Sequence, residues 1–173
     1  DRARLPEGVA DAYPLSQVQA GMVLEMSVDN GQNNYHNVTS FRIRDERPYD
    51  HPSLVEAARI VVARHEALRT SLDLTGYSVP MQLVHEIADM PVGTQSLHGL
   101  TEDEIRDAVR VYTARERARV FDLSVPTLMR LFAHDTGNGS WWLSITECHP
   151  VLEGWSHHSM LMEILDVYGA LRD

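Results

Sequence analysis

Lysine is absent from the 173-residue sequence, so all 15 basic residues are arginine. Positive charge is also scarce overall, because 25 acidic side chains give a formal net charge of −10 at pH 7. Nucleic acids and anionic membranes bind clustered positive charge. The composition therefore argues against both as partners.

The sequence contains a single cysteine, Cys148, so no disulfide can form within it. This favours a reducing, cytoplasmic location. One cysteine and scattered histidines also lack the ligand spacing of a zinc site. No uninterrupted apolar run approaches the ~18 residues that a membrane span needs. What remains is the composition of a globular chain, with 43% hydrophobic and 23% charged residues.

Capping patterns and helical apolar spacing predict four helices. Ser16 with Gln19, and Thr101 with Glu104, have the spacing of capping boxes. Pro52 suits the first turn of a helix. The last helix is expected to be capped by Ser156. The helices are expected at 16–26, 52–65, 101–120 and after 156.

Alternating apolar residues and turn signals predict the strands. Thr75-Gly76 separates two apolar runs, and the turn-rich segment 135–139 separates two more, which is typical of hairpins. The strands are expected at 35–44, 68–74, 79–84, 127–133 and 140–146. Strands and helices mixed in this way predict an α/β fold, a two-layer sandwich of one main mixed sheet with packed helices.

Three segments carry motifs of one family. They are YPLSQVQAGM at 13–22, RHEALRTSL at 64–72 and CHPVLEGWS at 148–156. In order and spacing they resemble the motifs of condensation domains from nonribosomal peptide synthetases, and the third resembles the His-His-x-x-x-Asp-Gly active-site motif. The resemblance implies a chloramphenicol-acetyltransferase-like fold. It identifies residues 1–173 as the N-terminal lobe, with the C-terminal lobe absent from this chain.

The resemblance also implies an activity and its partners. Condensation domains join a donor thioester on an upstream carrier protein to an aminoacyl acceptor on a downstream one. The substrates ride on the carriers' phosphopantetheine arms, so the domain needs no metal or cofactor of its own. The expected partners are therefore carrier domains and the missing C-terminal lobe, and the isolated lobe is expected to be inactive.

His149 is the leading catalytic candidate. Trp141, Leu143 and Ile145 alternate along a predicted strand that ends near it, so its imidazole is expected at the edge of a sheet. An imidazole titrates near neutrality and can accept a proton from an amine. By resemblance, His149 is the family's second histidine, which orients or deprotonates that amine. The Gly154 backbone amide is expected to approach the reacting carbonyl.

Three further residues are expected to support the site. By resemblance, Glu153 occupies the family's aspartate position and forms a buried ion pair with Arg69. Cys148 replaces the family's first histidine. Since a thiol is a weak hydrogen-bonding group, we expect a buried structural residue there. Pro150 removes a backbone donor from the same turn.

These departures leave other interpretations open. The chain could be a catalytically degenerate condensation-like domain that docks carrier proteins or a partner enzyme. It could also be a related acyltransferase acting on a freely diffusing alcohol or amine, which the first two motifs disfavour. His157 and His158 fall in the first turn of the last helix and carry little weight. The arginines of the 101–120 helix indicate either a solvated face or a docking surface for acidic carriers.

Overall fold

The computed structural model describes residues 5–28, 34–152 and 154–173. The elements in chain order are β1 (Val9–Pro14), α1 (Gln17–Val28), β2 (His36–Arg44), α2 (His51–Arg64), the 3₁₀ helix η2 (Glu66–Arg69), β3 (Thr70–Asp73), β4 (Met81–His85), β5 (Val92–Ser96), α3 (Glu102–Arg117), β6 (Met129–Asp135), β7 (Ser140–Cys148) and α4 (Gly154–Ala170).

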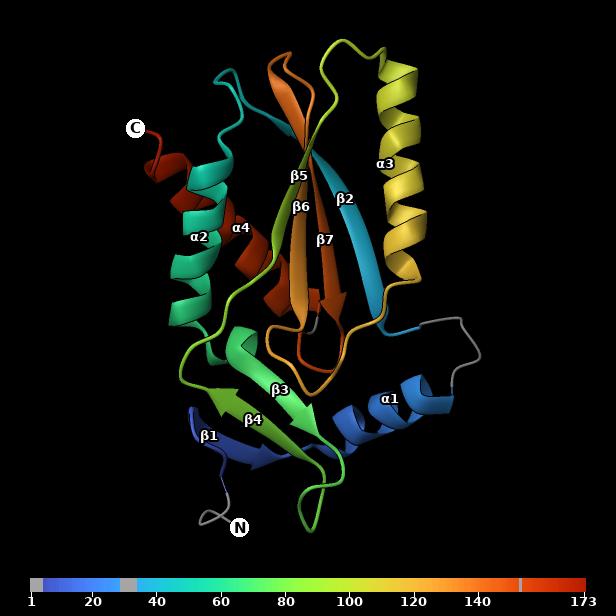
Figure 1. Ribbon diagram of the computed structural model, residues 1–173, viewed down its shortest axis with the longest axis vertical. Coiled ribbons are helices and arrows are strands. Elements are labelled where there is room, and N and C mark those ends of the chain that lie inside the picture. The colour runs from blue at the N-terminus through green and yellow to red at the C-terminus, as the bar shows by residue number, and fades with distance from the viewer. Residues whose placement is uncertain (1–4, 29–33, 153) are drawn as a thin grey trace.

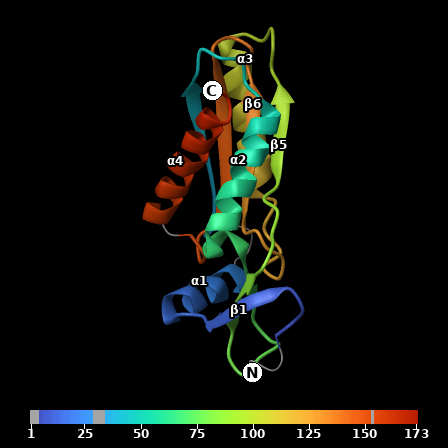
Figure 2. The ribbon, with the colours of Figure 1, turned by 90° about the vertical axis from the view of Figure 1, so that its left-hand side faces the viewer.

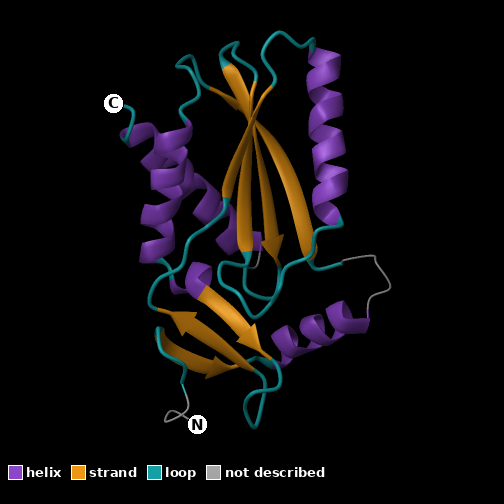
Figure 3. Cartoon of the chain, in the orientation of Figure 1, coloured by secondary structure: helices purple, strands orange, loops and turns teal. Residues whose placement is uncertain are grey.

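The main sheet has the strand order β2-β7-β6-β5, with the strands labelled in Figure 1 and drawn in orange in Figure 3. β7 pairs antiparallel with β2 and with β6, whereas β5 runs parallel to β6, so the predicted mixed sheet is confirmed. The predicted hairpin is β6–β7. Gly137 and Gly139 take positive φ angles of 69° and 72° in its loop, a region that glycine enters without steric cost.

Helices cover both faces of this sheet. α2 and α4 lie on one face and α3 on the other (Figures 1 and 2). Leu143, Ile145 and Ile164 are fully buried between the sheet and the α2–α4 layer. The predicted two-layer sandwich describes that half of the fold, and α3 adds a layer. Phe132 explains the addition, because it stacks on Tyr112 of α3 at 4.3 Å and so makes the opposite face apolar as well.

A second sheet of three antiparallel strands, ordered β1-β4-β3, lies below the main one (Figure 1). The predicted strands at 68–74 and 79–84 are therefore confirmed as the hairpin β3–β4, but β4 pairs with β1 and neither strand joins the main sheet. Neither β1 nor β5 was predicted. β5 is an edge strand of polar, largely exposed residues and lacks the alternation that identifies a half-buried strand.

Two of the three capping predictions, those at Ser16 and Thr101, are confirmed, and the cap at Ser156 is wrong because Ser156 lies inside α4. The Ser16 backbone donates to Gln19 Oε1 at 2.9 Å, and Gln19 N donates back to Ser16 Oγ at 3.2 Å. The reciprocal bonds of Thr101 and Glu104 open α3. α4 begins at Gly154, which is earlier than the predicted cap at Ser156. No helix in the described part of the chain has the length and apolar content to cross a membrane.

Candidate active site

β7 delivers the candidate residues to one end of the main sheet. Its odd-numbered residues Trp141, Leu143 and Ile145 are buried against α2 and α4. Alternate residues of a strand share a face, so the next two places in this series belong to Glu147 and to His149 just after the strand. The contacts bear this out, since His149 Nδ1 lies 3.8 Å from Glu147 Oε1.

His149 lies at the end of β7, and the Nδ1 edge of its ring is buried in the protein. Its backbone N–H donates to the Tyr35 carbonyl at 2.9 Å. The two rings stack at 9° with centroids 6.4 Å apart. The side chain is 29% exposed, yet its Nδ1 is buried and makes no aligned hydrogen bond within the described residues. Nε2 is therefore the ring nitrogen left for an incoming group.

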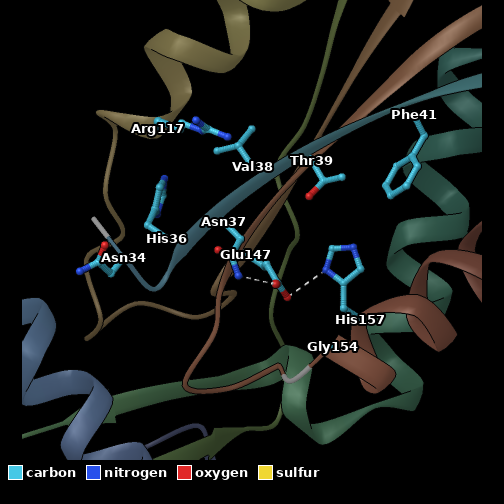
Figure 4. Close-up of a pocket in the computed structure, with 10 residues that line it drawn as sticks. All are labelled: Asn34, His36, Asn37, Val38, Thr39, Phe41, Arg117, Glu147, Gly154 and His157. Carbon is cyan, nitrogen blue, oxygen red and sulfur yellow. Dashed lines mark hydrogen bonds and ion pairs between the residues drawn. The ribbon is translucent and has the colours of Figure 1, made fainter. Parts of the chain in front are cut away.

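A pocket of about 590 Å³ lies beside this strand end. Residues of β2 form one side, and Glu147, Gly154 and His157 form another (Figure 4). His157 points at the Glu147 carboxylate, with Nδ1 3.0 Å from Oε2. Asn37 Nδ2 donates to Oε1 of the same carboxylate at 3.1 Å. The pocket wall is thus polar, and it meets the predicted catalytic residue through Glu147, since His149 itself is not among the residues that line the pocket.

Gly154 is the first residue of α4 and lies on the pocket wall. The first N–H groups of a helix have no acceptor within the helix, so they can donate to a ligand that carries negative charge. A Cβ built on Gly154 meets no protein atom within 4 Å. Packing therefore does not require glycine at this position.

Cys148 points away from this cluster. It is fully buried and packs with Val23, Leu72 and Leu128. Burial, with a smaller contribution from the charge of Glu147, raises the pKa of the thiol to about 12. At neutral pH it is a small apolar side chain, as predicted from its weak hydrogen bonding.

Cys148 should therefore resist thiol reagents while the chain is folded. Because the thiolate is the reactive form, we expect alkylation or disulfide exchange at pH 8 to be at least about 100-fold slower in the folded chain than in the urea-unfolded chain. The change in absorbance with an aromatic disulfide reagent measures both rates. Equal rates in the two states would show that the thiol is accessible.

Arg69 and Glu153 were predicted to form a buried ion pair. Glu153 lies outside the described residues, so the pair stays a prediction. The contacts of Arg69 itself are described. Nη1 donates to the carbonyl of His85 and, at 3.4 Å, to that of Glu86. Nε is buried without a hydrogen-bond partner among the described residues.

Sequence reasoning missed the polar side chains around the imidazole. Glu147 was not singled out, and His157 was set aside as part of a helix turn. His158 is exposed, as expected for one of the two adjacent histidines, but the side chain of His157 is only 13% exposed. Extending the alternation of Trp141, Leu143 and Ile145 by one step would have identified Glu147 as a carboxylate in an apolar series.

Comparison with known proteins extends the resemblance to almost the whole chain. A family model described as Condensation domain matches residues 9–173. The chain is 38% identical over 175 residues to the AMB antimetabolite synthetase AmbE of Pseudomonas aeruginosa, covering 99% of this chain and 8% of AmbE. It is 25% identical over 167 residues to gramicidin S synthase 2 of Brevibacillus brevis, covering 96% of this chain and 4% of that protein. The chain thus spans less than a tenth of the length of either relative.

Solved structures agree on the fold. The first condensation domain of the calcium-dependent antibiotic synthetase superposes with a TM-score of 0.81 at 21% identity, covering 95% of this chain and 40% of that one. The four-domain nonribosomal peptide synthetase AB3403 gives a TM-score of 0.77 at 17% identity, covering 95% of this chain and 12% of that one. With the family model spanning both sheets and all four helices, the chain belongs to the condensation-domain family of nonribosomal peptide synthetases.

Proposed function

We propose that this chain contributes the histidine-bearing half of a site that forms peptide bonds in nonribosomal peptide synthesis. The donor is an acyl or peptidyl thioester on an upstream carrier protein, and the acceptor is an aminoacyl group on a downstream carrier. Both arrive on phosphopantetheine arms, and the chain supplies no metal or cofactor. The C-terminal lobe completes the channel, and the reaction takes place in the cytoplasm.

The position of His149 is the observation that carries this proposal. The imidazole is fixed at the end of β7 by its backbone bond to Tyr35 and by the stacked ring. Its Nδ1 edge is buried toward Glu147, which leaves Nε2 for an amine. A group held in one orientation next to a polar pocket can position a nucleophile as well as accept its proton.

The reaction then balances as follows. The acceptor nitrogen attacks the thioester carbonyl, a C–N bond forms, and the carbonyl oxygen becomes anionic. The Gly154 N–H donates to that oxygen, and His149 takes the proton released from nitrogen. Collapse of the intermediate breaks the C–S bond. The imidazolium returns the proton to the departing thiolate, so no net proton is gained or lost.

A docking role without chemistry is the second candidate. Its support is Cys148, which is buried among apolar residues and cannot hydrogen-bond the motif as the family's first histidine would. The two functions separate in one assay on the full-length protein. With both carriers loaded, intact-protein mass spectrometry follows the donor chain from the upstream to the downstream arm. Transfer supports catalysis, and carrier binding without transfer supports docking.

Gly154→Ala tests the role of the helix start. The added methyl group would project into the pocket where the reacting carbonyl is expected, while meeting no protein atom. We therefore expect kcat for amide formation to fall about 10- to 100-fold with little change in the urea midpoint. Gly169→Ala in the same helix also meets no atom within 4 Å and serves as the control. An unchanged kcat in Gly154→Ala would remove this residue from the site.

A further inference from the structure

Glu147 places a carboxylate where the strand pattern calls for an apolar side chain. It follows Trp141, Leu143 and Ile145 on the α2–α4 face of β7, and it is only 4% exposed. A buried carboxylate is costly unless charged or hydrogen-bonding groups surround it. A residue with this cost, next to the predicted catalytic histidine, calls for a functional explanation.

One oxygen of this carboxylate and two histidine nitrogens beside it are buried without an aligned hydrogen bond in the described part of the chain. They are Glu147 Oε2, His149 Nδ1 and His157 Nδ1. Yet Oε2 lies 3.0 Å from His157 Nδ1, and Oε1 lies 3.8 Å from His149 Nδ1. Unsatisfied buried groups are rare in folded proteins, so a cluster of three beside the candidate histidine calls for an explanation.

The carboxylate is held in position from two sides. Asn37, its register partner on β2, donates to Oε1 at 3.1 Å. His157, on the first turn of α4, faces Oε2 (Figure 4). Both neighbours are on regular elements, so the carboxylate cannot swing away freely. A fixed acceptor on the buried side of an imidazole determines which ring nitrogen carries the proton.

We infer that Glu147 is the positioning residue of His149, an inference that rests on the proposed function. Its carboxylate accepts the Nδ1–H of the imidazole and so leaves the Nε2 lone pair facing outward to receive the proton of the amine. When that proton arrives, the negative charge of Glu147 stabilises the imidazolium. Hydrogen bonds of this kind are often long without substrate, and we expect the 3.8 Å contact to shorten when substrate binds.

This role also explains how the site works with a cysteine at position 148. The thiol of Cys148 lies among apolar side chains, so it offers His149 no polar support. Glu147 lies one residue earlier on the opposite face of the strand, and it supplies the polar support from that side. In this inference the polar support for His149 comes from residue 147, one position before the cysteine.

Kinetics of the full-length protein with both carriers loaded test the inference. Glu147→Leu continues the apolar series of β7, so the variant should fold, and we expect kcat to fall about 100-fold with the acceptor KM nearly unchanged. Glu147→Gln keeps an oxygen for Nδ1–H without the charge, and we expect a loss of about 10-fold. In a His149→Ala background, Glu147→Leu should change the remaining rate less than twofold, because the group it acts through is gone.

Glu163→Gln is the matched control, because it removes another carboxylate that contacts an imidazole, that of His65 at 2.6 Å. It should leave kcat unchanged. If His149→Ala abolishes the rate while Glu147→Leu retains it, the inference fails and the proposed function stands. Equal losses from Glu147→Leu in both backgrounds would also overturn it, because Glu147 would then act independently of His149. A native rate in His149→Ala would overturn the proposed function itself.

Discussion

Replacing His149 with alanine is expected to lower the single-turnover rate of amide formation at least about 100-fold, the usual contribution of a positioned acid–base group. Alanine removes the nitrogen that accepts the amine proton but keeps the backbone N–H that bonds Tyr35. The turn after β7 should therefore survive. The rate is measured on the full-length protein with both carriers loaded, from the mass gained by the downstream arm over time.

His158→Ala is the matched control for this loss. His158 is an exposed histidine near the start of α4 and close in sequence to His149, whereas its neighbour His157 is the one that faces Glu147. We expect its replacement to leave the rate within a factor of two. A His149→Ala variant that transfers the donor at the native rate would remove the imidazole from the mechanism, whatever its position in the fold.

The largest expected effect on stability comes from the ion pair between Arg130 of β6 and Glu116 near the end of α3. The two charges lie 2.6 Å apart with side chains 11% and 4% exposed. Thr146 also donates to the Glu116 carboxylate, and the guanidinium lies 4.0 Å from the Phe121 ring centroid. Removing one partner leaves the other charge buried, so Glu116→Gln or Arg130→Met should each cost about 3–5 kcal/mol of unfolding free energy.

Urea unfolding of the chain measures this cost. The double variant Glu116→Leu with Arg130→Met should lose much less than the sum of the single variants, because it leaves no unpaired charge. Glu102→Gln provides the control, since it breaks the Arg42–Glu102 pair, whose side chains are 39% and 46% exposed. We expect that variant to cost under about 1 kcal/mol. Single losses of that size at Glu116 and Arg130 would mean that the buried pair is not structurally important.

Local sequence signals predicted most of the fold. Capping boxes at Ser16 and Thr101 marked two helix starts because the bonds they form lie within one turn. The glycine-rich segment at 135–139 marked the β6–β7 hairpin for the same reason. β5 could not be predicted in this way. It is short and polar, and it exists because its backbone pairs with β6, which is distant in sequence.

In the candidate site, too, the residues of a continuous motif could be predicted and those brought together only by the fold could not. His149, Gly154 and Cys148 were identified from a motif that is continuous in sequence. Asn37 and His157 reach Glu147 from another strand and from a helix, and no local pattern records those contacts. The buried Arg130–Glu116 pair was missed for the same reason. A motif therefore identifies the candidate reacting group, whereas the residues that contact it become visible only when β2, β7 and α4 are assembled.

The position of the acceptor amine relative to His149 is the most direct test of the proposed chemistry. It can be measured in a crystal structure of the full-length protein with an unreactive acceptor analogue on the downstream carrier arm. We expect the amine nitrogen within about 2.6–3.2 Å of Nε2, with Nδ1 directed at Glu147. An amine held by other groups, with the imidazole of His149 turned into the apolar interior, would contradict the mechanism.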